Sequence, residues 1–142
     1  PGIMEAGNFG ASLAGGKSIG LNIALPFEQI PNSFQTRDFS FQFHYFFMRK
    51  LWFSFYARAL CIFPGGYGTM DELFEMLTLV QTNKVGKLPI VIFGEEFWKD
   101  IINFDKLTEY KVIDEKDKDI FKFFNDVDSA FKYLTSEMIL DY

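Results

Sequence analysis

Apolar and polar positions follow two different periods along this chain, and the period changes repeatedly. Short segments are apolar throughout or at every second residue, which is typical of strands. Longer segments have apolar residues three and four positions apart, which is typical of helices that bury one face. The strands predicted in this way are residues 18–25, 39–45, 59–63, 88–93 and 120–124. The predicted helices are residues 3–13, 46–57, 70–81, 95–104 and 127–140.

Strands that alternate with helices predict an α/β fold, with a parallel sheet covered by helices on both faces. The 142 residues fit one domain, residues 1–142, with no internal repeat and no linker long enough to divide it. Gly15 and Gly16 are expected to end the first helix. The polar stretches 26–37 and 114–119 are expected to be loops. In such sheets, ligands bind beyond the carboxyl ends of the strands.

Composition narrows the classes of partner. With 14 basic and 19 acidic residues the formal net charge is −5, which argues against nonspecific binding to nucleic acid or to an anionic membrane. No uninterrupted apolar run approaches the roughly 20 residues of a membrane helix. The single cysteine excludes an internal disulfide, and no signal peptide is recognisable, so the expected setting is the cytoplasm.

Three glycines in four positions, Gly65, Gly66 and Gly68, lie between a predicted strand and a predicted helix. A helix begins with N-H groups that lack partners and with the positive end of its dipole, so it attracts anions. Glycines allow positive φ and a close approach to a phosphate, and Thr69 adds a hydroxyl. The alternative is a tight connection with no ligand.

Glu72 has two interpretations. Thr69 and Glu72 have the spacing of a capping box, in which Thr69 is the N-cap and Glu72 bonds back to its N-H. A carboxylate one turn beyond a phosphate site is also placed to act on the sugar of a bound nucleotide.

Arg49 and Lys50 interrupt an aromatic helical segment. Their side chains either extend to solvent or form an anion clamp, in which arginine grips phosphate with two hydrogen bonds.

Other reactive side chains have structural explanations. His44 is the only histidine and has no ligand partners at metal-binding spacing, and Cys61 lies in a strand predicted to be buried. The phenylalanine-rich stretch 34–63 is either core or a face for self-association.

The segments "GIMEAGNFGA", "YFFMRK" and "PGGYGTMDE" together resemble the Lonely Guy (LOG) family of cytokinin riboside 5′-monophosphate phosphoribohydrolases, which are often labelled lysine decarboxylases. The resemblance implies a Rossmann-like fold and cleavage of the N-glycosidic bond of nucleoside 5′-monophosphates such as AMP. It implies no redox cofactor, no obligatory metal, and a homo-oligomer, either a dimer or a hexamer. A carrier of a phosphorylated ligand, similar to molybdenum-cofactor carrier proteins, is the alternative.

By this resemblance the catalytic residues are Arg49 and Glu72. The implied substrate and phosphate contacts are Met4, Lys50, Gly65, Gly66, Tyr67, Gly68 and Thr69. Asn22, Glu28 and Gln29 are weaker candidates for the lining of the pocket. In the family a glycine cluster and further strands precede the Met-Glu segment, so we expect an N-terminally truncated domain here.

Overall fold

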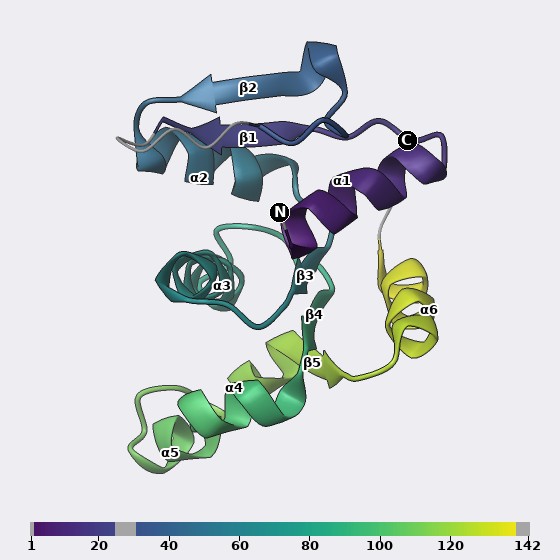
Figure 1. Cartoon of the computed structure of the whole chain (residues 1–142). Helices are drawn as coiled ribbons and strands as arrows, with labels where there is room; N and C mark the ends of the chain where they lie inside the picture. The colour runs from purple at the N-terminus through teal and green to yellow at the C-terminus, as the bar shows by residue number, and fades with distance from the viewer. Residues whose placement is uncertain (1, 25–30, 139–142) are drawn as a thin grey trace. The chain divides into compact units, whose positions relative to one another are not determined.

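The computed structural model describes residues 2–24 and 31–138, and the chain divides into two compact units, Pro1–Phe55 and Tyr56–Tyr142. Both units have parallel strands in open sheets and helices beside them (Figure 1). The predicted α/β class is therefore confirmed. The first unit contains the segments "GIMEAGNFGA" and "YFFMRK" of the family resemblance, and the second contains "PGGYGTMDE".

The first unit has a two-stranded sheet. Strand β1 pairs with β2 in parallel, with Gly20 opposite Ser40 and Ile23 opposite Phe43. Its elements are α1 (Ile3–Leu13), β1 (Gly20–Ile23), the 3₁₀ helix η1 (Arg37–Phe39), β2 (Ser40–Phe43) and α2 (Phe46–Tyr56). Both predicted strands are present but shorter than expected, and η1 lies at the edge of the predicted loop.

Helix α1 ends as its glycines predict. Gly15 has a φ of 69°, and its N-H donates to Ser12 O at 3.1 Å. The N-H of Gly16 donates to Ala11 O at 2.8 Å. These two bonds form a Schellman motif, and the left-handed backbone at Gly15 is why a residue without Cβ suits this position.

Hydrogen bonds between polar side chains connect several segments of the first unit. Gln35 Nε2 donates to Asn22 Oδ1 at 3.1 Å, and Asn22 Nδ2 donates to Gln35 Oε1 at 3.2 Å. Ser40 Oγ also donates to Gln35 Oε1, at 2.7 Å. A Cβ at Gly20 would overlap the Gln35 side chain, so this glycine allows the amide to approach β1 closely.

A second polar group joins α1 to the start of β1. Asn32 Nδ2 donates to Asn8 Oδ1 at 2.7 Å, and Asn8 also bonds to the hydroxyl of Ser18. Ser18 N donates to Thr36 Oγ1 at 2.9 Å, and Thr36 N donates to Ser18 O at 3.0 Å. Ser18 is buried with only 5% of its surface exposed, so these bonds satisfy a group that water does not reach.

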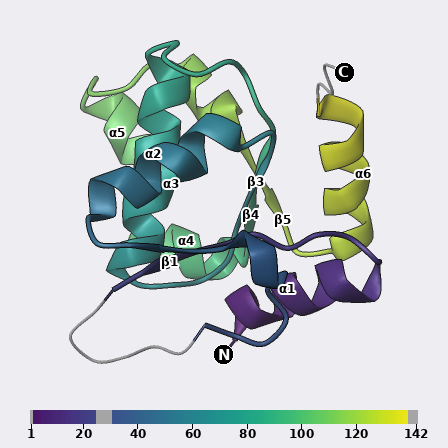
Figure 2. The ribbon, with the colours of Figure 1, turned by 90° about the horizontal axis from the view of Figure 1, so that it is seen from above.

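The second unit has a three-stranded parallel sheet in the order β3-β4-β5. Helix α3 lies on one side of this sheet and α6 on the other (Figures 1 and 2). The elements are β3 (Leu60–Ile62), α3 (Tyr67–Gln81), β4 (Ile90–Phe93), α4 (Glu95–Ile101), α5 (Phe104–Glu109), the 3₁₀ helix η2 (Glu115–Ile120), β5 (Phe121–Phe124) and α6 (Val127–Glu137).

An apolar core fixes the second unit. Ile90 and Ile92 of β4 are fully buried, and they pack in one cluster with Leu73 of α3 and Trp98 of α4. Trp98 is 0% exposed, and its Nε1-H donates to Phe93 O at 3.1 Å. The indole therefore buries a large apolar surface without leaving its one donor unsatisfied.

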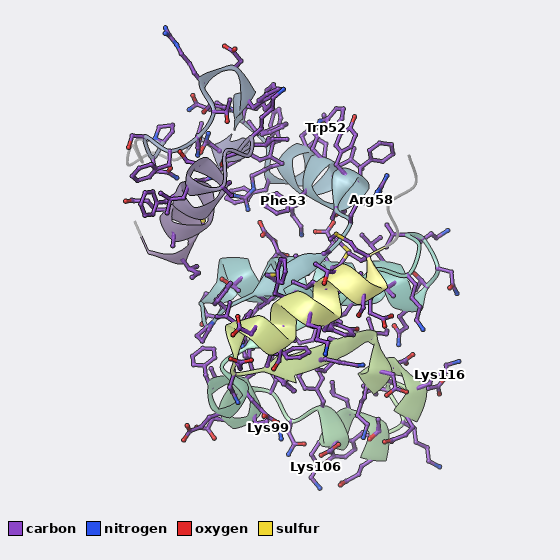
Figure 3. The ribbon with its side chains drawn as sticks, turned by 90° about the vertical axis from the view of Figure 1, so that its right-hand side faces the viewer. Trp52, Phe53, Arg58, Lys99, Lys106 and Lys116 are labelled. Carbon is purple, nitrogen blue, oxygen red and sulfur yellow. The ribbon has the colours of Figure 1, made fainter. Side chains whose placement is uncertain are left out.

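Three local predictions for this unit need correction. The charged stretch 114–119 is largely helical rather than a loop, because Asp114 and Asp117 form a capping box that starts η2. Helix α4 stops at Ile101, and α5, which Asn103 caps by accepting from Lys106 N at 3.0 Å, was not predicted. Figure 3 shows Lys106 and Lys116 at the periphery of this unit.

Cys61 lies in β3 as predicted, but its side chain is exposed. In the register of the sheet, Cys61 stands beside Val91, on the face opposite the Ile90 and Ile92 cluster. Helix α6 contacts β4 and β5 on that face. The expected burial of Cys61 was wrong. The pattern of apolar residues along a strand does not reveal which strands of the sheet a helix such as α6 covers.

Candidate active site

The glycine turn leads directly from the sheet into a helix. Strand β3 ends at Ile62, and α3 begins at Tyr67, three residues earlier than predicted. The N-cap is Gly66, and the first intrahelical bond runs from Met70 N to Gly66 O at 3.0 Å. The N-H groups of Tyr67, Gly68 and Thr69 precede that bond, so the positive end of α3 lies at the carboxyl edge of the sheet.

The glycines of the turn serve close approach rather than unusual φ angles. The glycines with positive φ among the described residues are Gly2, Gly15 and Gly94, so the expected use of positive φ at the turn is wrong. A Cβ at Gly66 or Gly68 would meet no described atom within 4 Å. Both positions therefore expose bare backbone at the start of α3, as an approaching anion requires.

Gly65 has a different role, because Thr69 packs against it. A Cβ at Gly65 would overlap Thr69 Oγ1 and lie 2.8 Å from Thr69 Cβ. The side chain of Thr69 thus folds back over the turn that precedes its own helix. Gly65 allows this contact, which fixes the position of Thr69 relative to the turn.

The capping-box interpretation of Thr69 and Glu72 is wrong. Thr69 is the third residue of α3 and not its N-cap, and the N-cap Gly66 makes no side-chain capping bond. Glycine is itself an accepted N-cap, which is why the helix extends back past the threonine. The structural alternative for Glu72, a bond back to an N-capping threonine, is therefore removed.

Glu72 is the sixth residue of α3 and is partly buried. Positions three and four residues apart share one helix face, so Glu72 lies above Thr69 and Gly68. Leu73 and Met76, which pack into the core, hold this part of the helix in place. The second unit therefore brings together a bare helix start, a hydroxyl and a carboxylate one turn further on. Tyr67, 93% exposed, borders the same turn.

Arg49 and Lys50 belong to the first unit. Helix α2 follows β2 just as α3 follows β3, and the two cations are its fourth and fifth residues. Both are partly buried. The Nε atom of Arg49 is shielded from solvent, and its guanidinium carbon lies 5.8 Å from the centre of the Phe46 ring. The ring thus holds the cation in the first turn of the helix that leaves the carboxyl edge of its sheet.

The remaining candidate residues are not at the glycine turn, or they fall outside the residues that the structure describes. Met4 is in the first turn of α1 and is 73% exposed. Asn22 bonds to Gln35 as part of the polar group on β1. Glu28 and Gln29 fall outside the described residues. His44 is exposed and lies edge-on to Tyr45, with 4.8 Å between the ring centres.

The aromatic side chains of helix α2, which belong to the phenylalanine-rich stretch 34–63, are not buried in an apolar core. The exposed fractions of its phenylalanines range from 41% at Phe53 to 66% at Phe47. Trp52, on the same helix, is 39% exposed (Figure 3). No residue of α2 is buried.

Sequence reasoning missed Gly94, which directly follows β4. Its backbone is left-handed, with φ 80° and ψ 56°, and a Cβ there would lie 2.8 Å from Pro64 Cγ in the glycine turn. The only sequence signal was a glycine at the end of the most apolar strand. The neighbouring proline is 30 positions away in the chain and becomes a neighbour only through the β3-β4 register.

The fold and the site define an α/β protein with parallel strands and a glycine-rich strand-to-helix turn. A family model described as "Possible lysine decarboxylase" matches residues 4–134, which is nearly the whole chain. The chain therefore belongs to that family, the LOG family whose motifs it carries. No curated protein matches the chain significantly.

Among residues 2–24 and 31–138, no three His, Cys, Asp or Glu side chains gather as a metal site requires. Within the same ranges, no helix combines the length and the apolar character needed to cross a bilayer.

Proposed function

We propose that this chain hydrolyses the N-glycosidic bond of nucleoside 5′-monophosphates, AMP or cytokinin riboside 5′-monophosphates, to free base and ribose 5-phosphate. One observation carries the proposal: the N-cap of α3 is Gly66 and not Thr69, so bare N-H groups and Glu72 lie on one helix without a capping box between them. Membership of the LOG family supports the same reaction. The cytoplasm is the setting that we propose for it.

The 5′-phosphate binds at the start of α3 in this proposal. The N-H groups of Tyr67, Gly68 and Thr69 donate to its oxygens, and the helix dipole favours its charge. The Thr69 hydroxyl, held against Gly65, supplies a further donor. Fixing the phosphate orients the ribose, so binding energy is converted into positioning.

Glu72 acts at the sugar. As the bond between C1′ and the base nitrogen breaks, positive charge develops on the ribose, and a carboxylate stabilises it. Glu72 also orients the water whose oxygen then bonds to C1′, while the proton released from that water balances the proton taken up by the departing base. A glutamine has no negative charge and performs neither task.

Arg49 has a catalytic role in this proposal because the family motif assigns one to it. It either donates a hydrogen bond to the leaving base or helps to hold the phosphate, and Lys50 adds a second positive charge. The two roles differ in their kinetics, since loss of phosphate binding raises KM whereas loss of leaving-group assistance lowers kcat.

The test follows release of base by chromatography from AMP, isopentenyl-AMP, GMP and CMP. We expect turnover by the wild type and at least about a hundredfold lower kcat in Glu72→Gln. Glu75→Gln is the matched control, because Glu75 is a partly buried carboxylate on the same helix. Arg49→Ala is paired in the same way with Arg58→Ala, an exposed arginine outside the proposed site (Figure 3).

Two outcomes contradict the hydrolase. If AMP binds and stays intact, and Glu72→Gln binds it equally well, the chain is a carrier of a phosphorylated ligand. If the chain instead releases carbon dioxide from lysine in the presence of pyridoxal phosphate, the reaction named in the family description is correct.

We also propose that the chain forms a homo-oligomer through α2. Its exposed aromatic side chains form an apolar helix surface of the kind that marks interaction sites. Light scattering after size exclusion measures the mass of the particle in solution. Phe47→Ser should lower that mass, whereas Phe131→Ser, a change at an equally exposed phenylalanine on α6, should not. A monomeric wild type contradicts this proposal.

A further inference from the structure

Two neighbouring strands deliver two loops to the same edge of the sheet in the second unit. Because β3 and β4 are parallel and Ile62 pairs with Ile92, the residues that follow each strand lie side by side. Phe63 and Phe93 stack with their ring centres 4.8 Å apart and their planes 4° from parallel. One position further, Pro64 of the glycine turn stands against Gly94.

Gly94 is constrained in two independent ways. Its φ of 80° and ψ of 56° are left-handed, a conformation that side chains with a Cβ rarely adopt. In addition, a Cβ would lie 2.8 Å from Pro64 Cγ and 3.4 Å from Pro64 Cδ. Carbon atoms in contact are about 3.5 Å apart, so the proline ring would have to retreat by about 0.7 Å.

A displacement of Pro64 passes to the turn through covalent and packing contacts. Pro64 is bonded to Gly65, Gly65 lies directly against Thr69, and Thr69 sits among the N-H groups at the start of α3. Gly94, at the other end of this series of contacts, is fixed in position. It is the N-cap of α4, and its carbonyl oxygen accepts from Trp98 N at 3.3 Å. Trp98 is itself fully buried.

We propose that Gly94 is a positioning residue for the phosphate-binding turn: its missing side chain lets Pro64 rest against the end of β4, which sets where the N-H groups of α3 point. This inference rests on the proposed function, since it concerns the phosphate end of that substrate. Gly94 does not touch the ligand. It acts through Pro64 and Gly65, so its replacement should impair phosphate recognition selectively.

The experiment measures calorimetric affinity for two probes, ribose 5-phosphate and adenine. In Gly94→Ala we expect about tenfold to a hundredfold weaker binding of ribose 5-phosphate, because small misplacements at a site are costly. Affinity for adenine should change less than about threefold. For AMP hydrolysis the same variant should raise KM more than it lowers kcat.

A second substitution tests the path. In Gly94→Ala/Pro64→Ala the proline Cγ is gone, so part of the lost affinity for ribose 5-phosphate should return, even though two residues are now changed. Gly86→Ala is the matched control, because a Cβ there meets no described atom within 4 Å and its φ is not positive. We expect wild-type affinity from it.

The outcomes separate the two proposals. If the wild type binds ribose 5-phosphate and Gly94→Ala binds it equally well, or if the double variant shows no recovery, the role of Gly94 is overturned and the hydrolase proposal stands. If the wild type neither binds this probe nor cleaves AMP, both fail. Should Gly94→Ala not fold, Pro64→Ala alone decides. An affinity for ribose 5-phosphate at least about threefold lower than that of the wild type supports the path, and an unchanged affinity refutes it.

Discussion

Each of the two units contains a parallel strand that leads into a helix with a candidate charged group. The interactions that stabilise the two units nevertheless differ. In the second unit, fully buried Ile90, Ile92 and Trp98 hold β4 and α4 in one apolar cluster. In the first, the residues classed as buried among those described are Ser18 and Gly20, and amide and hydroxyl side chains connect the segments.

This difference has consequences for stability. Burying a large apolar side chain contributes roughly 1.5–3 kcal/mol, whereas a typical internal hydrogen bond contributes about 0.5–1.5 kcal/mol net. We therefore expect the first unit to open locally more easily than the second. The candidate carboxylate Glu72 is on the firmer unit and Arg49 on the softer one.

The largest expected effect comes from the core of the second unit. Trp98→Ala should lower the free energy of unfolding by about 3–5 kcal/mol, because it empties a fully buried site. Urea unfolding followed by far-UV circular dichroism measures it. Leu13→Ala is the control, since Leu13 at the end of α1 is 72% exposed and its replacement should cost less than about 1 kcal/mol. Equal losses at both positions would erase the contrast between the units.

A smaller effect is expected from the polar group of the first unit. Gln35→Ala removes its bonds to Asn22 and Ser40, and should lower the free energy of unfolding by about 1–3 kcal/mol. Gln42→Ala, at an exposed position of β2, should change stability by less than about 0.5 kcal/mol. If the two variants unfold at the same urea concentration, the amide group is not what holds β1 and β2.

A gain in stability is expected at the end of α5. Lys111 has a left-handed φ of 59°, and its N-H donates to Thr108 O at 2.9 Å in a Schellman motif. Lys111→Gly relieves that strain, and should raise the free energy of unfolding by about 0.5–1 kcal/mol. Lys116→Gly, within η2, should not raise it. A lower urea midpoint for Lys111→Gly would contradict this reading of the motif.

The smallest effect appears only in acid. The side-chain and backbone donors of Ser129 stabilise the Asp126 carboxylate at the start of α6 and lower its pKa. The Asp126 carboxylate therefore stabilises the folded state above the unfolded pKa of about 3.9. This stabilisation is lost as the pH falls through the lower pKa of the folded state. Asp126→Asn should reduce the difference in urea midpoint between pH 7 and pH 3, and Asp128→Asn controls for the lost charge. An unchanged difference would show that this carboxylate is not linked to stability.

The sequence predicted most helices and strands because the spacing of apolar residues follows the geometry of the element that buries them. It misplaced the start of α3 because glycine and threonine are comparable N-caps by residue type, so the local sequence did not show that the helix extends back to Gly66. The motifs made Arg49 and Glu72 candidate catalytic residues through the resemblance to the family, and that assignment stays a prediction. Gly94 was missed because its contact with Pro64 depends on strand register, which no local pattern encodes.

The exposure of Cys61 makes the chain convenient for spectroscopy. It is the single cysteine of the sequence and lies three residues before Pro64, so a thiol-reactive fluorophore attaches at one position beside the glycine turn without any engineering. Neighbouring atoms partly desolvate the sulfur and raise the pKa of the thiol even though the side chain is exposed, so labelling proceeds faster in mildly alkaline buffer. We expect the emission of the attached dye to change if a phosphate compound binds at the turn as proposed.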